Sequence, residues 1–479
     1  MQVHESLYLG GEWRPALDNA AIEVRSPSTE QLIGSVPAAG RADVDDAVAA
    51  ARRALRSAEW ADLNPDRRAA LIDRFADELV ADLADRARLT SEQNGMPISI
   101  ALPAEGQLPV GLLRYYAELC RTRPVEERRP RLDGRGSTLV RREPVGVVAA
   151  VVPWNFPQTL TMFKLAPALA AGCPVVLKPS PETVLDAFEL AAAADRAGIP
   201  PGVLNVVPGG ADVGEYLVAH PGVDKVAFTG STTAGREIGE ACGRLLRPVT
   251  LELGGKSAAI VADDADVAAL AQRLAGVSLL NSGQTCYVST RILAPRRRYD
   301  EVVDAVAGVA GSLTVGDPLD RATQIGPMVS SRHRDRVEAY IELGVAEGAK
   351  LVAGGGRPET DRGWFVRPTV FAGVDADSRI AREEIFGPVL VVLPYEELDE
   401  AVALANDSDY GLGGTVWTSD VEKGIDLARR IESGSVGVNF YSLDPASPFG
   451  GYKDSGVGRE LGPEGLAAYE QLKSIYLSH

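Results

Sequence analysis

The fold is decided by the stretch Gly146-Val-Val-Ala-Ala-Val-Val152, which runs directly into Pro153-Trp154-Asn155-Phe156-Pro157. A short apolar run of this kind is typical of a strand buried on both faces of a parallel sheet. The turn after it carries one amide side chain between two aromatic residues. Ligands of open α/β sheets bind at the carboxyl ends of the strands, so Asn155 is a candidate ligand-binding residue. A turn in which Asn155 bonds only its own backbone is the alternative.

Further β-branched runs follow this stretch, at residues 175–178, 204–207, 225–229 and 258–261. Segments with helical spacing separate them, at residues 184–197, 211–219, 234–244 and 267–280. This alternation is expected of a parallel sheet covered on both faces. We therefore predict a doubly wound α/β unit from Gly146 to about Leu253, which ends at the conformationally free Gly254-Gly255 pair.

A second alternation predicts a second α/β domain, with strands near 289–293, 389–393, 414–417 and 435–439 and helices at 299–310, 331–347 and 398–405. Towards the N-terminus, helical spacing over residues 43–58 and 66–92 predicts two long helices that open the chain, with Asp43 and Asp66 as their caps. Residues 137–143 look extended. They form either a linker or, as we favour, a projecting strand.

Length and composition limit the kind of protein. A chain of 479 residues exceeds the roughly 250–300 residues at which one core stops growing, so two or three domains are expected. The net charge of −17 disfavours nucleic acid as a partner. No apolar run approaches the roughly 20 residues of a membrane span, and the first ten residues do not resemble a secretion signal. We expect a cytoplasmic protein without a membrane partner.

Four cysteines and four histidines are scattered without Cys-x-x-Cys pairs, which argues against a metal site or a disulfide framework. Cys286 stands apart because it follows the polar turn Asn281-Ser-Gly-Gln-Thr285, where a partly ionised thiol can act as a nucleophile. A small buried hydrophobic residue is the alternative. We interpret Cys120, Cys173 and Cys242 as structural.

Two segments suit a nucleotide. Lys178-Pro179-Ser180 places an ammonium group and a hydroxyl at a predicted strand end. The loop from Gly230 through Ser231 opens a helix whose N–H groups and dipole can hold a phosphate. Gly230 and Gly235 are separated by four residues, so the loop lacks both the usual dinucleotide fingerprint and a P-loop lysine. A nonstandard dinucleotide site fits better.

Two glutamates are candidates for chemistry. Glu252 lies among apolar neighbours in Leu251-Glu-Leu-Gly-Gly-Lys256, where desolvation raises a carboxyl pKa into the range of a general base. An ion-paired structural glutamate is the alternative. Glu384, in Glu383-Glu-Ile-Phe-Gly-Pro388, precedes a predicted strand and suits ribose hydroxyls.

These segments, in this order, resemble those of the aldehyde dehydrogenase superfamily, and specifically its NAD(P)-dependent, non-acylating members. The resemblance includes the closing Pro448-Phe-Gly-Gly-Tyr-Lys453 and Gly458-Arg-Glu-Leu-Gly462. It implies an α/β fold with a Rossmann-type NAD(P)-binding domain (1–121 and 144–253), an α/β catalytic domain (254–457) and a small β oligomerisation element (122–143 and 458–479). It also implies a homodimer or homotetramer. A solitary strand at 137–142 would expose an unpaired edge, which is a physical reason for assembly.

The resemblance also implies residue roles. Cys286 attacks the aldehyde carbon, while the Asn155 side chain and the Cys286 N–H hold the oxyanion. Glu252 activates the water that hydrolyses the thioester, and Lys164 with Glu460 matches a proton relay of some relatives. The implied cofactor residues are Val152, Pro153, Trp154, Lys178, Ser180, Gly230, Ser231, Leu253, Gly254, Glu384 and Phe386. The implied substrate residues are Phe156, Leu160, Phe163, Tyr287 and Phe449.

NAD is the expected cofactor, with NADP left open. Three residues past Lys178, where many NAD-selective relatives have a glutamate against the adenosine ribose, this chain has Pro181, and Glu182 follows. A 2′-phosphate near Lys178 and Ser180 is therefore not strictly excluded, although no added arginine there favours it.

The implied substrate residues are apolar or aromatic, which favours an aliphatic or aromatic aldehyde over a carboxylated one. Asp444 either prefers a cationic aminoaldehyde or faces solvent, so an aminoaldehyde or semialdehyde dehydrogenase stays open. A coenzyme A-acylating enzyme is less favoured, because such relatives typically lack the general-base glutamate. A catalytically silent scaffold is less favoured because Cys286, Glu252 and Asn155 are all intact.

Overall fold

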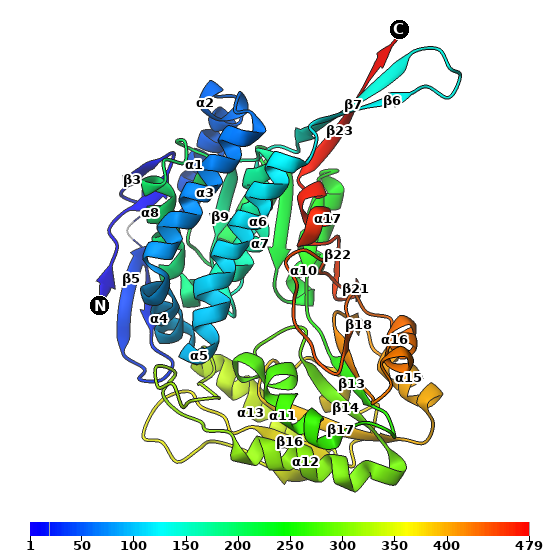
Figure 1. Cartoon of the computed structure of the whole chain (residues 1–479). Coiled ribbons are helices and arrows are strands. Elements are labelled where there is room, and N and C mark those ends of the chain that lie inside the picture. The colour runs from blue at the N-terminus through cyan, green and yellow to red at the C-terminus, as the bar shows by residue number, and fades with distance from the viewer. Residues whose placement is uncertain (19, 479) are drawn as a thin grey trace.

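Two helix-covered sheets form the body of the molecule, and a narrow third sheet projects from one end (Figure 1). The structure, a computed structural model, describes residues 1–18 and 20–478. No helix within these ranges is long and apolar enough to cross a membrane.

The first sheet has the strand order β10-β9-β8-β11-β12-β22, and all of its strands are parallel except β22. The strands are β8 (Val148–Val151), β9 (Val175–Lys178), β10 (Leu204–Val206), β11 (Lys225–Thr229), β12 (Val249–Glu252) and β22 (Gly456–Val457). The chain runs outward from β8 to β10 and then returns to place β11 on the other side of β8. Ligands of doubly wound sheets bind at such a switch point. The predicted α/β unit is confirmed, although β12 was not predicted.

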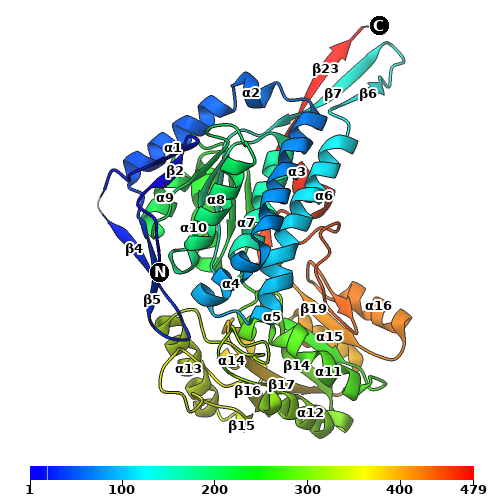
Figure 2. The same ribbon diagram turned by 60° about the vertical axis from the view of Figure 1, so that its left-hand side comes forward.

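The helices α8 (Leu185–Arg196), α9 (Ala211–Ala219) and α10 (Thr232–Arg244) connect these strands close to their predicted positions. The sequence analysis did not identify α7 (Pro157–Ala171), which joins β8 to β9. All of its residues are buried, so it lacks the one-sided apolar pattern that reveals a surface helix. It packs beside α3 (Pro65–Ala81) and α6 (Leu108–Thr122), as Figure 2 shows.

The second sheet has the order β15-β16-β17-β14-β13-β19-β20, with only β15 antiparallel to its neighbour. Its strands are β13 (Ser257–Val261), β14 (Ser289–Pro295), β15 (Lys350–Ala353), β16 (Thr369–Ala372), β17 (Val389–Tyr395), β19 (Gly414–Trp417) and β20 (Gly437–Val438). Its helices include α11 (Val267–Ser278), α12 (Tyr299–Ser312), α13 (Ser331–Ala346), α14 (Arg379–Arg382), α15 (Leu398–Asn406) and α16 (Val421–Arg430). The predicted second α/β alternation is confirmed.

The N-terminal prediction was partly wrong. In the described part of this segment, five short strands precede the first helix: β1 (Gln2–Val3), β2 (Leu7–Leu9), β3 (Glu12–Arg14), β4 (Ala21–Arg25) and β5 (Leu32–Pro37). The helices are α1 (Arg41–Ala54), the single turn α2 (Ala58–Ala61), α3 and α4 (Leu83–Asn94), so the predicted helix 66–92 is interrupted at Asp82. Gly40 and Asn64 are the N-cap residues, not Asp43 and Asp66. Asp43 instead accepts the Gly40 N–H from inside the first turn, at 2.9 Å.

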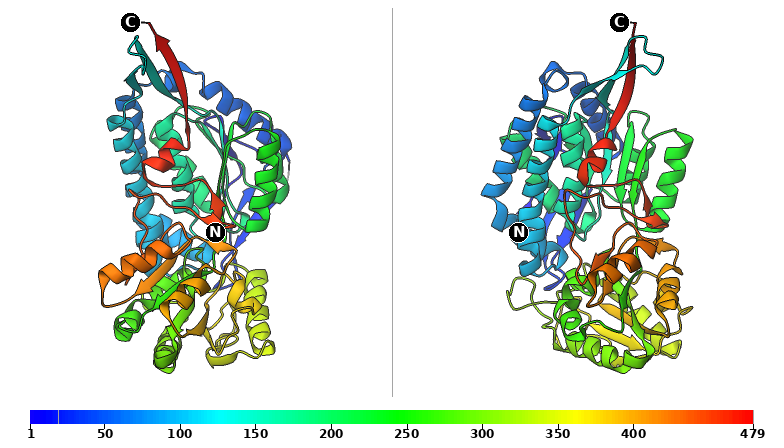
Figure 3. Two further views of the ribbon diagram at one scale, coloured as in Figure 1. Left: turned by 90° about the vertical axis from the view of Figure 1, so that its right-hand side faces the viewer. Right: turned by 45° about the vertical axis from the view of Figure 1, so that its right-hand side comes forward.

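The projecting sheet contains β6 (Glu126–Pro130), β7 (Ser137–Pro144) and β23 (Glu470–Leu477) in the antiparallel order β23-β7-β6 (Figure 3). The strand that we expected to be solitary, β7, is the middle strand. An unpaired edge of β7 was therefore the wrong reason for assembly, because this chain pairs both of its edges. The outer edges belong to β6 and β23.

Candidate active site

The two loops at the switch point meet as the sequence predicts. β8 and β11 are parallel neighbours, with Val151 opposite Phe228. The turn with Asn155 follows β8, and Gly230 and Ser231 follow β11. The first sheet therefore brings the predicted catalytic amide and the predicted phosphate loop to the same edge.

The loop before Cys286 has an unusual backbone. Asn281 (φ 50°), Ser282 (φ 58°) and Gly283 (φ 74°) are three consecutive residues in the left-handed region, which costs free energy at the two non-glycine positions. Ser282 holds the loop, because its hydroxyl donates to the Gly326 carbonyl at 3.1 Å and accepts the Gly326 N–H at 2.9 Å. A Cβ at position 283 would collide with the Gly387 carbonyl. The strained turn fixes the backbone that leads to Cys286.

Asn155 is connected to this loop by its side chain and its backbone. Its Nδ2 donates to the Gln284 carbonyl at 3.1 Å, and its own carbonyl accepts from Asn281 Nδ2 at 3.0 Å and from Asn94 Nδ2 at 3.2 Å. A side-chain amide has two N–H groups, so a second one is left for a ligand beside the Cys286 loop.

Glu252 ends β12, and its carboxyl group lies against the Phe449-Gly450 turn, since a Cβ at Gly450 would be 2.7 Å from Oε1. Within the described residues neither carboxyl oxygen has a hydrogen-bond partner. Burial, and then the Glu460 carboxylate, raise the pKa of Glu252 well above its usual value. This is the desolvated environment that the sequence analysis predicted.

Cys286 is half-buried, whereas the other three cysteines are buried. Burial raises the pKa of the Cys286 thiol, and the Glu384 and Glu252 carboxylates add to the rise. Backbone hydrogen bonds from Cys286 and Tyr287 lower this pKa in part, but the net direction disfavours the partly ionised thiol of the sequence analysis. A base must remove the proton before the sulfur can attack.

Lys164 and Glu460 form a fully buried ion pair, with Nζ 2.8 Å from Oε1. Lys164 Nζ also donates to Thr229 Oγ1 at 2.6 Å. Charges on both residues influence the pKa of Glu252. The structure thus brings the three residues together, as expected for the predicted relay.

The predicted adenosine site lies at the end of β9. Burial lowers the pKa of Lys178 to about 8, partly offset by the carboxylates of Glu182 and Asp212. Ser180 Oγ donates to Glu182 Oε2 at 2.6 Å. Glu182, which follows Pro181, therefore brings a carboxylate next to Lys178 and Ser180.

Ser231 is the N-cap of α10, where its side chain accepts the Ala234 N–H at 3.3 Å. Leu253 packs against this helix, since a Cβ at Gly235 would collide with its side chain. The start of α10 is therefore close to Leu253, another of the implied cofactor residues.

Glu384 accepts the Gly255 N–H at 2.9 Å, and burial raises its pKa to about 7. Phe386 has a left-handed backbone (φ 63°), and its ring makes edge contact with Trp154 at 5.4 Å. His333 was missed by the sequence analysis. The centroid of its ring lies 5.2 Å from that of Trp154, and its Nε2 lies 2.7 Å from the Phe386 carbonyl oxygen. A lone histidine in a polar helix gives no sequence signal for this contact.

The predicted substrate residues divide into two groups. Phe156 and Leu160 are buried around the start of α7. The ring centroids of Phe163 and Tyr287 lie 6.4 and 6.1 Å from the ring centroid of Phe449, both in edge-on orientation. Tyr441 joins this aromatic cluster and was missed: it stacks on Tyr287 at 4.9 Å, and its hydroxyl is 2.5 Å from Ser435 Oγ.

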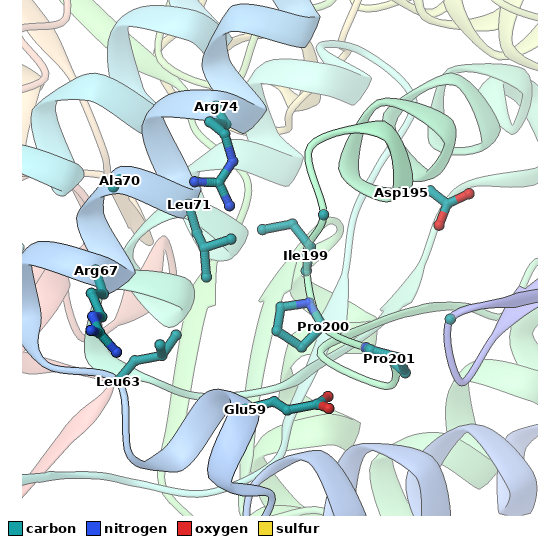
Figure 4. A pocket seen from close by; sticks show the side chains of 12 residues that line it. Glu59, Leu63, Arg67, Ala70, Leu71, Arg74, Asp195, Ile199, Pro200 and Pro201 are labelled. Atoms are coloured by element: carbon teal, nitrogen blue, oxygen red, sulfur yellow. The ribbon is translucent and has the colours of Figure 1, made fainter.

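A separate surface hollow of about 590 Å³ lies between α3 and the loop Ile199-Pro200-Pro201 (Figure 4). Its charged residues, Glu59, Arg67, Arg74 and Asp195, have both signs. None of its lining residues belongs to the predicted catalytic, cofactor or substrate sets, so it is not the site described above. Within the described residues there is no group of three or more His, Cys, Asp or Glu side chains placed to hold a metal ion.

Residues 13–475 match the family model described as aldehyde dehydrogenase family. The chain is 59% identical over 474 residues to a geranial dehydrogenase of Castellaniella defragrans, with 99% of each chain covered. An aldehyde dehydrogenase of Mycobacterium tuberculosis complexed with NAD+ has a TM-score of 0.97 and 48% identity, with 99% of this chain and 98% of that chain covered. A mutant aldehyde dehydrogenase C of Pseudomonas syringae, complexed with NAD+ and octanal, has a TM-score of 0.95 and 41% identity, with 98% and 96% covered.

The fold and the comparisons define the class as an NAD-dependent oxidoreductase that converts an aldehyde to a carboxylic acid. The chain belongs to the aldehyde dehydrogenase family. The described residues fit the cofactor, since a capped helix start, a buried lysine and a buried carboxyl lie around the switch point.

Proposed function

We propose that this chain oxidises a bulky apolar aldehyde through a thioester on Cys286, with NAD+ preferred over NADP+. The aromatic cluster of Phe163, Tyr287, Tyr441 and Phe449 beside Cys286 is the observation that carries the proposal. An aromatic cluster of this kind suits an unsaturated or aromatic substrate, because the faces of its rings can bury a large apolar area of the substrate. The similarity to a geranial dehydrogenase supports the same substrate class.

The reaction begins when the Cys286 thiol loses its proton to a solvent base and the sulfur attacks the aldehyde carbon. Asn155 Nδ2 and the Cys286 N–H hold the oxyanion that forms. NAD+, when bound, would supply the acceptor for the hydride of this carbon, and loss of that hydride leaves a thioester on Cys286. Glu252 takes a proton from the attacking water, the acid leaves, and Lys164 with Glu460 relays the proton away from Glu252.

The remaining cofactor residues of the proposal act by position. Lys178 and Ser180 would hold the adenosine ribose, Ser231 and the start of α10 would hold the pyrophosphate, and Glu384 would hold the nicotinamide ribose. The Glu182 carboxylate beside Ser180 would repel a 2′-phosphate, which supports NAD+. Val152, Pro153, Trp154, Gly230, Leu253, Gly254 and Phe386 line the groove.

An aminoaldehyde is the less favoured substrate. Asp444, its only proposed recognition group, is exposed and already accepts the Ala446 N–H and the Ser447 hydroxyl, both at 3.0 Å. Its carboxylate therefore stabilises the loop that carries it.

Three further properties are proposed with this function. The chain divides into an NAD(P)-binding domain (1–121 and 144–253), a catalytic domain (254–457) and an oligomerisation element (122–143 and 458–479). It assembles as a homodimer or homotetramer, and it is cytoplasmic, a location that its need for NAD+ supports.

Steady-state reduction of NAD+ with citral-type, aromatic, short aliphatic, amino and carboxylated aldehydes tests the substrate class. We expect the highest kcat/KM with the branched unsaturated aldehyde. Tyr441→Ala should lower this value about tenfold and change that for propanal little, whereas Tyr216→Ala, outside the cluster, should change neither. A preference for aminoaldehydes, or equal loss with both substrates, would refute the assigned class.

A further inference from the structure

A buried carboxylate from a distant segment caps the helix that follows Asn155. The helix α7 begins at Pro157, and its own N-cap residue, Phe156, provides no side-chain hydrogen bond. Glu105 takes this place: its Oε2 accepts the Gln158 N–H at 2.7 Å and its Oε1 accepts the Thr159 N–H at 3.4 Å. Its side chain is fully buried. Two N–H groups that the helix cannot satisfy are thus bonded to one carboxylate.

Glu105 lies in a π-helical turn, Leu102–Gln107, a rare conformation that is frequent at functional sites. The turn is fixed from both sides. Arg86 donates to the Glu105 carbonyl at 3.1 Å and to the Gly106 carbonyl at 3.0 Å, and the Thr159 hydroxyl donates to the Ala104 carbonyl. The carboxylate is therefore held rigidly against the start of α7.

Residues of α4 and α8 hold the start of α7 and the loop before it. Gln158 Nε2 donates to Thr90 Oγ1 at 3.0 Å and to Asp186 Oδ1 at 3.1 Å. Asn94 Nδ2 bonds the carbonyls of Trp154 and Asn155, both at 3.2 Å. The segment from Trp154 to Thr159 thus depends on side chains that belong to neither the proposed catalytic set nor the proposed substrate set.

We propose that Glu105 is a positioning residue, which keeps the Asn155 amide aimed at the oxyanion by anchoring the first turn of α7. The proposal rests on the proposed role of Asn155. A carboxylate at a helix start is bound by charge-assisted hydrogen bonds and by the helix dipole. When it is lost, the turn is free to shift, and a misplacement of about 1 Å can cost about 100-fold in rate.

The first test compares Glu105→Gln and Glu105→Asp with a matched control. Asp43→Asn removes another fully buried carboxylate that accepts backbone N–H groups, at the start of α1. Burial and Asp186 raise the pKa of Glu105 to about 8, so assays are run at pH 9. We expect kcat to fall about tenfold in Glu105→Gln and less in Glu105→Asp, with an unchanged NAD+ dissociation constant. Asp43→Asn should lose as much thermal stability as Glu105→Gln but keep the kcat of the unmodified enzyme. Equal kcat losses in Glu105→Gln and Asp43→Asn would overturn the proposal.

The deciding test is a double-mutant cycle with Asn155→Ala. If Glu105 acts through Asn155, Glu105→Gln should slow the Asn155→Ala enzyme less than twofold. If the two losses multiply, the positioning role of Glu105 is overturned while the role of Asn155 stands. If Asn155→Ala alone keeps full activity, the proposed oxyanion role fails, and the proposal for Glu105 fails with it.

Discussion

Replacing Asn155 with alanine should slow turnover strongly while the enzyme stays folded. The amide donates one N–H to Gln284, which leaves the other for the oxyanion. At 4% exposure it lies in a site with little water, where hydrogen bonds to a developing charge are strong. Loss of one oxyanion donor of two costs about 2.7–4 kcal/mol, or about 10²–10³-fold in kcat. The lost bond to the Gln284 carbonyl costs about 1 kcal/mol of stability.

The assay is the absorbance of reduced nicotinamide with a saturating aldehyde. Two controls separate chemistry from folding: NAD+ binding measured by quenching of protein fluorescence, and the rate of alkylation of Cys286. Both should stay within about twofold of the unmodified enzyme, because the other bonds of the strained loop, from Ser282 to Gly326 and from Asn281 to the Asn155 carbonyl, are kept. A loss of kcat below fivefold, with both controls normal, would refute the oxyanion role of Asn155.

The remaining predictions concern the base, its pH dependence, cofactor choice and assembly. Glu252→Gln should give a burst of one equivalent of reduced nicotinamide and then turnover slowed about 100-fold; a linear trace at the normal rate would contradict its role. Burial and Glu460 raise the pKa of Glu252 and Lys164 lowers it, so kcat should rise with pH as the carboxyl ionises, and Lys164→Met should move the midpoint to higher pH. An unmoved midpoint in the kcat profile argues against this coupling. Glu182→Gln should raise the NADP+/NAD+ ratio of kcat/KM at least about tenfold by removing a repulsive charge, and an unchanged ratio rejects this explanation. Leu472 is 66% exposed on β23, and we expect it in an interface between subunits. Leu472→Asp should therefore lower the mass measured by light scattering, and an unchanged mass would contradict this placement.

The sequence predicted the two parallel α/β units well, because short β-branched runs and helices alternate with clear boundaries. It failed where the pattern is not periodic or not one-sided. The helix α7 is buried all round, so its apolar residues do not form a stripe. The strands β1 to β5 have two to six residues each, too short for alternation to be recognised.

The candidate site shows the same division. Asn155, Glu252 and Cys286 could be proposed from the sequence because each lies in a compact motif, and their roles come from the family resemblance. The strand order brings these motifs together. The pKa of Cys286 could not, since it depends on burial and on Glu384 and Glu252 from other parts of the chain. The place of Tyr441 in the aromatic cluster could not be predicted either, because its stacking on Tyr287 joins residues far apart in the sequence.

Glu105 shows why positioning residues are harder to predict than reacting ones. A reacting group needs a particular chemistry, so its residue type narrows the choice. A positioning group needs only a hydrogen-bond acceptor in one place, and Glu105 reaches that place through a π-helical turn 53 residues before Gln158. Its segment, Leu102-Pro-Ala-Glu-Gly-Gln107, contains a proline and a glycine and reads locally as a helix break. Only the packed structure shows that this break places the Glu105 carboxyl group against the first turn of α7, the helix that follows Asn155.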